Sequence, residues 1–224
     1  TSKKHFITIS PFFSADHISG RFVEQYEYDH ENESDYQRRE KPDFSFTLGA
    51  LAQYRMNNKF SILSGLSFSN AGVSISAASV NALKDETGAY KFKLATSYGL
   101  VEFSKSGITP TAGDTLLVTG AALNLQYISI PVLVKYNIHA GKLKLSAHGG
   151  IAINKIMSDK VEADYTVQNN SEFETINKIQ GIKRVFFTVN AGVEAGYSIS
   201  RKIDLSVSPE LRYGINSINK STPV

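Results

Sequence analysis

The chain has no cysteine and no tryptophan, and only two of its 224 residues are methionine. Without cysteine, the protein can form no disulfide bridge, no thiolate metal site and no cysteine nucleophile. No stretch approaches the roughly 18 to 20 consecutive apolar residues that a membrane-spanning helix needs. The net charge of +3 is small and the basic residues are scattered, so we predict no nucleic-acid partner.

Sequence motifs of catalysis and cofactor binding are also missing. No G-x-S-x-G elbow, phosphate-binding loop or dinucleotide-binding glycine pattern occurs in the sequence. The five histidines, at positions 5, 17, 30, 139 and 148, lack the spacing typical of metal ligands. The sequence therefore predicts no catalytic residue, no cofactor and no metal, and it favours a non-enzymatic protein.

What the chain does contain is a regular alternation of apolar and polar residues. In the segment VNAGVEAGYSISRKIDLSVSPELRYGI, residues 189–215, apolar side chains occupy every second position on both sides of a hinge at 200–202. A period of two places these side chains on one face of a β-strand. Both strands, at about 13 to 15 residues, exceed the roughly 5 to 6 residues usual in globular sheets.

The same alternation recurs from end to end and predicts a single all-β domain that covers residues 1–224. The first strand carries apolar residues on both sides, so the sequence leaves its register open. The expected strands cover residues 5–13, 44–56, 60–69, 123–138, 143–156, 185–199 and 203–216.

The connections between these strands are either very short or long. Three hairpins keep apolar residues opposite apolar residues with turns of only three or four residues. The residues that pair across these turns are Met56 with Phe60, Ile138 with Leu143, and Ile199 with Ile203. The other connections are long and cover residues 14–42, 70–122 and 158–183. This is the layout of an up-and-down outer-membrane β-barrel, with short periplasmic turns and long extracellular loops.

The polar row decides which face of the strands points outward. Its residues are mostly serine, threonine and glycine, whereas a sheet surface in water carries many lysines and glutamates. Small side chains suit the crowded interior of a barrel of about eight strands, which also disfavours an open pore. We therefore predict that the apolar row faces outer-membrane lipid and that the small polar row fills the lumen. The alternative is a soluble lipocalin-like barrel or a sandwich.

Aromatic residues of the apolar row support the membrane interpretation because they form two levels. One level lies close to the short turns, and the other lies toward the opposite strand ends. Ten residues of tilted strand between the levels rise about 25 Å, the height of the apolar band of such barrels. The predicted girdle residues are Phe44, Tyr54, Phe60, Phe68, Tyr136, Phe187, Tyr197 and Tyr213.

The charged residues of the strands fall mainly in the inward row, where they avoid the cost of contact with lipid. We predict a structural charge network in the lumen that consists of Arg55, Lys135, Lys144, Glu194, Glu210 and Arg212. Glu194 and Glu210 lie near enough for acid/base chemistry, but the neighbouring cations favour the structural role. Asp204 is expected in water at the short-turn rim, and His148 is expected to be a hydrogen-bonded inward residue.

An acidic segment, residues 24–40, contains oxygen ligands that could hold calcium. It lacks the glycine and the terminal glutamate of a calcium-binding loop, so we interpret it as a solvated outer loop.

Two stretches of the sequence, YISIPVLVKYNIHAGKLKLSAHGGIAIN (127–154) and GIKRVFFTVNAGVEAGYSISRKIDLSVSPELRYGINSINKSTPV (181–224), resemble the PorT-like outer-membrane β-barrels of Bacteroidetes-type bacteria. The segment FSILSGLSFSNAGVSI (60–75) is similar as well. The resemblance covers about half the chain, is specific for the barrel and says little about activity. The segments ATSYGLVEF and INKSTPV are similar to members that form the outer-membrane end of envelope-spanning anti-sigma regulators.

The expected strands number seven, whereas bacterial single-chain barrels have an even number. In the family that the chain resembles, a closing strand follows the INKSTPV segment. We therefore expect an eighth strand after Val224, and we expect residues 90–103 to form a hairpin arm inside a long outer loop.

Two functions follow from this barrel. The first is a non-enzymatic interaction, anchoring or signal-sensing module that contacts other envelope proteins through its long loops or its N-terminal side. The second is a barrel subunit of a secretion or assembly complex. A membrane-embedded enzyme is a third class, but it would need a catalytic cluster that the sequence does not show.

Overall fold

A computed structural model describes residues 7–18, 40–85, 87–103, 109–167, 170–176, 179, 181–200, 203–216 and 218. The regular elements of these residues are all β-strands and the strand pairs are antiparallel, which confirms the predicted fold class. A membrane-spanning helix is absent from this described part of the chain.

The strands differ greatly in length. Three of them, β4, β7 and β8, have 25 or 26 residues each. The elements are β1 (Ile7–Asp16), β2 (Glu40–Pro42), β3 (Ser45–Arg55), β4 (Phe60–Lys84), β5 (Tyr90–Thr96), β6 (Gly99–Phe103), β7 (Thr115–Ala140), β8 (Leu143–Val167), β9 (Asn170–Ile176), β10 (Val185–Ser198), β11 (Asp204–Val207) and β12 (Glu210–Gly214).

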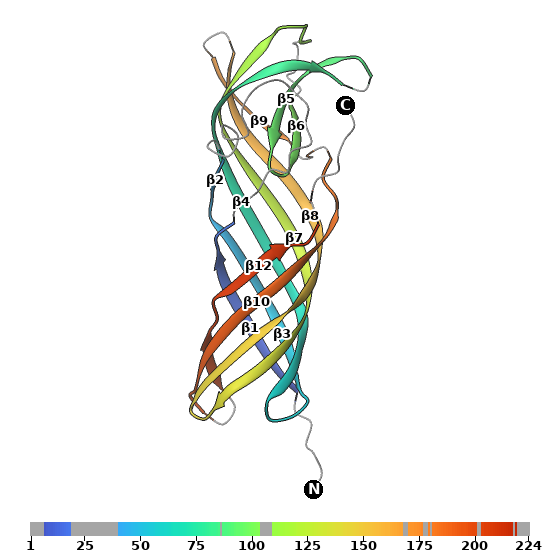
Figure 1. Cartoon of the computed structure of the whole chain (residues 1–224). Helices are drawn as coiled ribbons and strands as arrows, with labels where there is room; N and C mark the ends of the chain where they lie inside the picture. Colours follow the sequence, from blue (N-terminus) through green and yellow to red (C-terminus); the bar gives the residue numbers. More distant parts are fainter. Residues whose placement is uncertain are drawn as a thin grey trace.

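The main sheet has the order β1-β3-β4-β7-β8-β10-β11, and β12 continues β11 along β10. It curls into a tall cylinder of tilted strands whose short turns gather at one end (Figure 1). Each predicted strand corresponds to one position in this order, with the last expected strand divided between β11 and β12. The division falls at Ser208 and Pro209, and Pro209 has no N–H to donate to β10.

Two of the three predicted hairpin registers are confirmed. Backbone N–H groups of Met56 and Ile199 donate to the carbonyls of Phe60 and Ile203, both at 3.0 Å. The prediction that Ile138 pairs with Leu143 is wrong, because β7 and β8 are connected more tightly and Ala140 pairs with Lys144. A register shift between Asn137 and His139 leaves Ile138 without a partner on β8. The apolar residues of β7 and β8 keep their shared face because the true pairing differs from the predicted one by two residues.

The predicted long loops 70–122 and 158–183 are wrong over much of their length. Strand β4 continues to Lys84, β7 already begins at Thr115 and β8 continues to Val167. The short strand β9 lies within the second of these ranges and pairs with β8. The three long strands therefore extend well beyond the part of the sheet that the sequence predicted. Of the loop 14–42, residues 14–16 belong to β1 and residues 40–42 form β2, whereas 19–39 lie outside the described residues.

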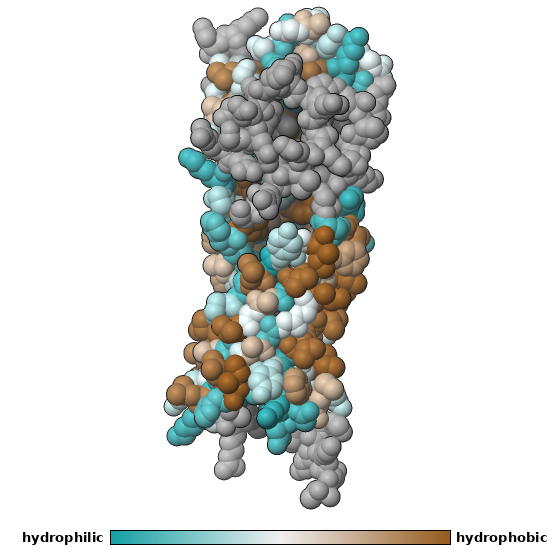
Figure 2. Space-filling view, in the orientation of Figure 1, coloured by the Kyte–Doolittle hydropathy of each residue, from teal (hydrophilic) through white to brown (hydrophobic). Residues whose placement is uncertain are grey.

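The lower part of the cylinder has apolar side chains outside and small polar side chains inside, as predicted. Leu48, Leu66 and Ile153 are examples of the outer row, with exposed fractions of 47%, 56% and 49%. Thr47 and Ser61 are fully buried on the inner face. Figure 2 shows brown apolar side chains spread over the visible lower surface, interleaved with white and teal residues. If lipid surrounds this face, as the sequence predicts, the exposed apolar surface needs no protein partner.

The upper part of the cylinder has the opposite arrangement, and we call it the sleeve. The sleeve consists of residues 71–84 of β4, 115–126 of β7 and 158–167 of β8, together with β5, β6 and β9. Its strands pair in the order β6-β5-β4-β7-β8-β9, and β6 lies against β9. Its interior is a continuous apolar core that includes Val73, Val80, Phe103, Val118, Leu123, Val161 and Tyr165.

A register shift marks the boundary between the two parts. Tyr127 pairs with Ile156 and Gln126 pairs with Ser158, which leaves Met157 without a partner on β7. The inward positions of β8 change at this bulge from even numbers, such as Asn154, to odd numbers, such as Val161. Above the bulge, Lys160, Glu162 and Asp164 face outward into water.

The two edges of the main sheet run in the same direction. Strand β1 is antiparallel to β3, and β11 and β12 are antiparallel to β10, so both edges rise from the short-turn end. No described strand pairs with their free sides. One descending strand between them would complete an antiparallel barrel, and the strand expected after Val224 stays a prediction. Residues 90–103, expected to form one arm of a hairpin, form the complete hairpin β5–β6.

Inward-facing glycines allow the narrow sheet to bend sharply. A Cβ atom built on Gly150 would collide with the carbonyl oxygen of Val132 and would lie 2.8 Å from Leu133 Cα. A Cβ atom on Gly65 would collide in the same way with the carbonyl oxygen of Ala50. These positions need glycine because the neighbouring backbone occupies the space of a side chain.

We predict that Gly150→Ala lowers the free energy of unfolding by about 3 kcal/mol, because the backbone of β7 must move away to admit the methyl group. The change is measured by urea unfolding in lipid vesicles, in which heat-modifiable gel migration reports the folded fraction. The matched control is Gly149→Ala, whose Cβ would lie 3.5 Å from the Asn190 carbonyl oxygen, an ordinary contact. Equal stability of the two variants would contradict the explanation.

Candidate functional site

A chain of hydrogen bonds runs along the inner face of the lower part of the cylinder. We call this lower part, below the bulge at Met157, the membrane part. Ser129 on β7 donates to the side-chain oxygen of Asn154 on β8. Asn154 Nδ2 donates to Thr188 Oγ1 at 3.3 Å, and Thr188 Oγ1 donates to Asn190 Oδ1 at 3.0 Å. Asn190 Nδ2 then donates to Glu210 Oε1 on β12, also at 3.0 Å. These inward side chains satisfy one another where little water can reach them.

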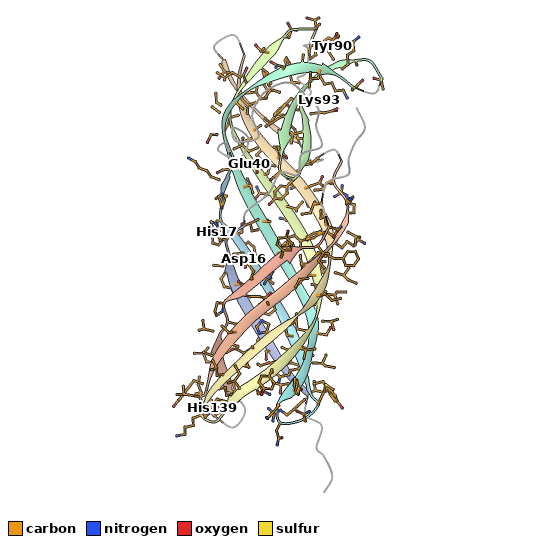
Figure 3. All side chains as sticks on the ribbon, viewed as in Figure 1. Asp16, His17, Glu40, Tyr90, Lys93 and His139 are labelled. Atoms are coloured by element: carbon orange, nitrogen blue, oxygen red, sulfur yellow. The ribbon has the colours of Figure 1, made fainter. Side chains whose placement is uncertain are left out.

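The chain continues across the open seam through Arg212. The guanidinium Nε donates to Glu210 Oε1 at 2.9 Å, and Nη1 donates to Thr47 Oγ1 on β3 at 2.9 Å. Thr47 donates to Asp16 on β1 and lies 2.8 Å from the hydroxyl of Ser69 on β4. Asp16 is labelled in Figure 3, about halfway along the cylinder. Arg212 therefore connects the last strand of the sheet to the first two, and we call the whole set of hydrogen bonds the lumenal network.

A separate ion pair lies deeper toward the short turns. Lys135 Nζ donates to Glu194 Oε1 at 2.7 Å, and the two side chains are only 10% and 22% exposed. Lys144 pairs with Asp204 at 2.6 Å, but these side chains are 39% and 47% exposed at the rim. Burial makes the first pair important for stability, whereas water screens the second.

The structure places five of the six predicted charged residues in ion pairs. The exception is Arg55, which is exposed at the short-turn end and forms no ion pair with any residue the structure describes. Arg55 is the last residue of β3, and its side chain is exposed there. The alternation predicted correctly that Arg55 belongs to the inward row of β3. It did not predict how far along the barrel axis Arg55 lies.

His148 faces inward, with its Nε2 atom 3.4 Å from Glu210 Oε2. Its Nδ1 atom is buried and has no hydrogen-bond partner among the described residues. A hydrolytic relay requires a nucleophile on one ring nitrogen and a carboxylate on the other. Glu210 supplies only the carboxylate, and its other oxygen already binds Asn190 and Arg212. The arrangement is suited to holding strands together rather than to acid/base catalysis.

Metal binding finds no support in the described part of the chain, where no group of three histidine, aspartate or glutamate side chains could hold an ion. The acidic segment 24–40 lies outside the described residues except for Glu40.

The eight predicted girdle residues lie on the outer face at two heights. Near the short turns, the rings of Phe60 and Tyr136 are 5.1 Å apart. At the opposite end of the membrane part, Phe46 contacts Phe44 and Phe68, with ring centroids 5.9 Å and 6.4 Å apart. Phe46 belongs to the same outer row as the predicted girdle residues of this level, Phe44 and Phe68.

The hairpin β5–β6 fills the space directly above the membrane part. Its turn points toward the lumen in Figure 1, and Tyr98 at the turn is buried. Tyr127 and Phe186 form an edge-on ring pair, 5.3 Å apart, at the same boundary. The aromatic rings and the apolar sleeve core above them close the lumen at its outer end.

One hydrogen bond fastens the turn of this hairpin to the wall. The Ser97 N–H donates to Glu40 Oε1 at 2.7 Å, and Glu40 belongs to the short strand β2 beside β4 (Figure 3). Burial raises the pKa of Glu40 above its ordinary value of 4.5, although hydrogen bonds from Ser97 oppose the shift. The carboxylate is therefore held in a position that favours its protonated form.

A second buried carboxylate fixes the far wall of the sleeve. Asp159 is only 2% exposed, and it accepts hydrogen bonds from the Ile179 backbone N–H at 2.8 Å and from Arg184. Sequence reasoning missed Asp159 and Glu40 because it assigned both to loops. The alternation of Val161, Ala163 and Tyr165 with charged residues could have revealed the strand that carries Asp159.

Residues 13–222 match the family model described as outer membrane protein beta-barrel domain. No curated protein and no solved structure matches the chain. The matched range includes the strands from β2 to β12 and part of β1, so both the membrane part and the sleeve belong to the matched domain.

We predict that Lys135→Met lowers the free energy of unfolding by roughly 3 kcal/mol, because it leaves Glu194 buried without a partner. The double variant Lys135→Met, Glu194→Gln should recover part of this loss. The control Lys144→Met should cost only about 0 to 1 kcal/mol, since its partner Asp204 stays in water. Urea unfolding in lipid vesicles measures the three variants, and equal losses for Lys135 and Lys144 would refute the distinction.

We also predict that Glu40 makes the sleeve less stable as the pH rises. A folded-state pKa above 4.5 means that Glu40 stabilises the fold below that value and that this stabilisation is lost as the pH rises through the raised pKa. The melting temperature of the wild type relative to Glu40→Gln should therefore fall between about pH 4 and 7. Glu162→Gln, at an exposed position, serves as the control and should show no such trend. A constant difference between the melting temperatures of the wild type and Glu40→Gln across this pH range would contradict the prediction.

Proposed function

This chain belongs to the outer membrane protein β-barrel domain family, and we propose that it is a non-enzymatic anchor which holds an interaction module at the cell surface. The protein lies in the bacterial outer membrane, with its apolar outer row in lipid. Short turns of such barrels face the periplasm, so the sleeve projects to the extracellular side.

The observation that carries the proposal is that the apolar side chains of β8 face outward below the bulge at Met157 and inward above it. A transmembrane barrel needs strands only as tall as the apolar band, about 9 to 11 residues each. Strands β4, β7 and β8 instead have 25 or 26 residues, and their upper parts enclose a core of their own. A rigid sleeve with a packed apolar interior and a charged exterior supports a role in contact with other macromolecules rather than in transport.

The interior of the protein supports the same proposal. The hairpin β5–β6 closes the outer mouth, and the lumenal network and the Lys135–Glu194 pair occupy the membrane part. A solute path would have to displace both an apolar core and a set of satisfied polar groups. We infer that the barrel does not conduct solutes.

The partner in this proposal is another envelope protein, and the context is that of the PorT-like barrels that the sequence resembles. Strand β1 enters the sheet at the short-turn end, where Ile7 pairs with Tyr54. A preceding segment would thus join the barrel from the periplasmic side, as an envelope-spanning regulator requires.

A test of this function is photo-crosslinking from the sleeve in intact cells. A crosslinking residue at Lys160 or Asp164, both on the outer face of β8, should give discrete protein adducts. The same residue at Ile151, on the lipid-facing part of the same strand, should give none. Adducts at Ile151 alone would contradict a sleeve-mediated contact.

The purified wild type should also pass no current in planar bilayers, because its lumen is filled. Steady single-channel steps would overturn the anchoring function in favour of a pore, whatever the crosslinking shows.

A further inference from the structure

The short-turn end of the barrel carries a set of basic side chains that neither the lumenal network nor the sleeve uses. We call this set the basic rim; it consists of Arg55, Lys59, His139, Lys142 and Lys144. They lie on successive strands or turns of the sheet, from the end of β3 to the beginning of β8. His139 is labelled at this end in Figure 3.

The charge of the basic rim is almost uncompensated. Among the described residues of this end, Asp204 is the one acidic side chain, and it pairs with Lys144. Among the residues that the structure describes, Arg55, Lys59 and Lys142 form no ion pair. The sleeve differs, because Lys91 and Lys93 there pair with Glu102. Among the described residues, the periplasmic end therefore carries several exposed cations with a single acidic partner.

The basic turns are held firmly against their neighbours. The Lys59 carbonyl accepts a hydrogen bond from the Asn137 N–H at 2.7 Å, and the Lys142 carbonyl accepts one from the Ser198 N–H at 2.9 Å. The side chain of Asn57 accepts from the N–H groups of Lys59 and Phe60, each at 2.8 Å. The backbone positions that carry Lys59 and Lys142 are therefore fixed relative to the neighbouring strands.

The height of the basic rim relative to the bilayer follows from the girdle directly above it. Tyr54, Phe60, Tyr136 and Tyr197 are exposed on the outer face within a few residues of the basic side chains. Aromatic rings of membrane proteins collect at the border between hydrocarbon and headgroups. Lysine and arginine side chains just beyond that border reach the level of the lipid phosphates.

From this arrangement we propose that the basic rim binds the headgroups of anionic phospholipids in the periplasmic leaflet of the outer membrane. Phosphatidylglycerol, with a phosphate and a net negative charge, is the chemistry that fits. Exposed cations without acidic partners attract such a headgroup, whereas the zwitterionic headgroup of phosphatidylcholine places its own cation nearby. The rim would thereby fix the depth and the tilt of the barrel from below.

An acidic segment of a periplasmic protein would be attracted by the same charges. The lipid is favoured because Arg55, Lys59 and Lys142 are exposed at the short-turn edge within a few residues of the girdle, where lipid headgroups are neighbours. A protein partner would have to displace those lipids first.

The test uses the full chain in mixed micelles that hold equal amounts of phosphatidylglycerol and phosphatidylcholine with identical acyl chains. Native mass spectrometry counts the lipids that stay bound. We expect the wild type to retain phosphatidylglycerol in preference, and we expect the triple variant Arg55→Gln, Lys59→Gln, Lys142→Gln to lose at least about fivefold of that preference. High salt should reduce the wild-type preference in the same direction.

The matched control removes three exposed cations above the membrane part, Lys41→Gln on β2 and Lys84→Gln and Lys160→Gln in the sleeve, and should keep the wild-type preference. If the triple rim variant does not fold, as judged by heat-modifiable migration, the double variant Lys59→Gln, Lys142→Gln changes turn residues only and replaces it. The proposal is overturned if the rim variant keeps the preference, or if the matched control loses it equally. It is also overturned if wild-type protein shows no lipid preference and instead binds a polyglutamate peptide in micelles of phosphatidylcholine alone.

Discussion

Strands β4, β7 and β8 pass from lipid into water, and no single alternation of side chains suits both surroundings. In lipid, an outward charge is costly and an outward leucine is not. In water, the apolar side chains must turn inward and pack against one another. The bulge at Met157 reconciles the two requirements on β8, because one extra residue exchanges the two faces of the strand without breaking its pairing with β7. The height of the membrane part, the sleeve core and the outward charges of β8 all depend on where that exchange occurs.

The membrane part is held together by polar contacts because its lumen is too narrow for an apolar core of large side chains. Glycines such as Gly150 let the sheet bend, and serines, threonines and asparagines fill the space that remains. The chain of hydrogen bonds begins at Ser129 on β7 and ends at Asp16 on β1, so it joins strands that are far apart in the sheet order. Arg212 makes the link between the two edges of the sheet. Side-chain contacts therefore connect the two edges, which no described backbone ladder joins.

The two halves of the protein have different roles. The lower half fixes the position in the membrane through its apolar row, its girdles and the basic rim. The upper half presents a stiff surface outside the membrane, and the hairpin β5–β6 separates it from the lumen. The Glu40 contact joins a short strand of the wall to the hairpin turn. A filled barrel that carries a projecting module is consistent with anchoring and recognition, and it leaves little room for transport.

The sequence by itself determined the local features that depend on period and spacing. The alternation fixed the strands, two of the three hairpin registers and the lipid-facing row, because a period of two and a short turn leave few alternatives. It also identified the inward charges, although Arg55 shows that parity does not specify height. Only the tertiary structure decided which inward residues meet. Arg212 and Thr47 are 165 positions apart, and their contact depends on the curl of the sheet. The sleeve, too, was decided in three dimensions, because the residues of 70–122 and 158–183 form strands only where β4, β7 and β8 continue side by side and bury a shared core.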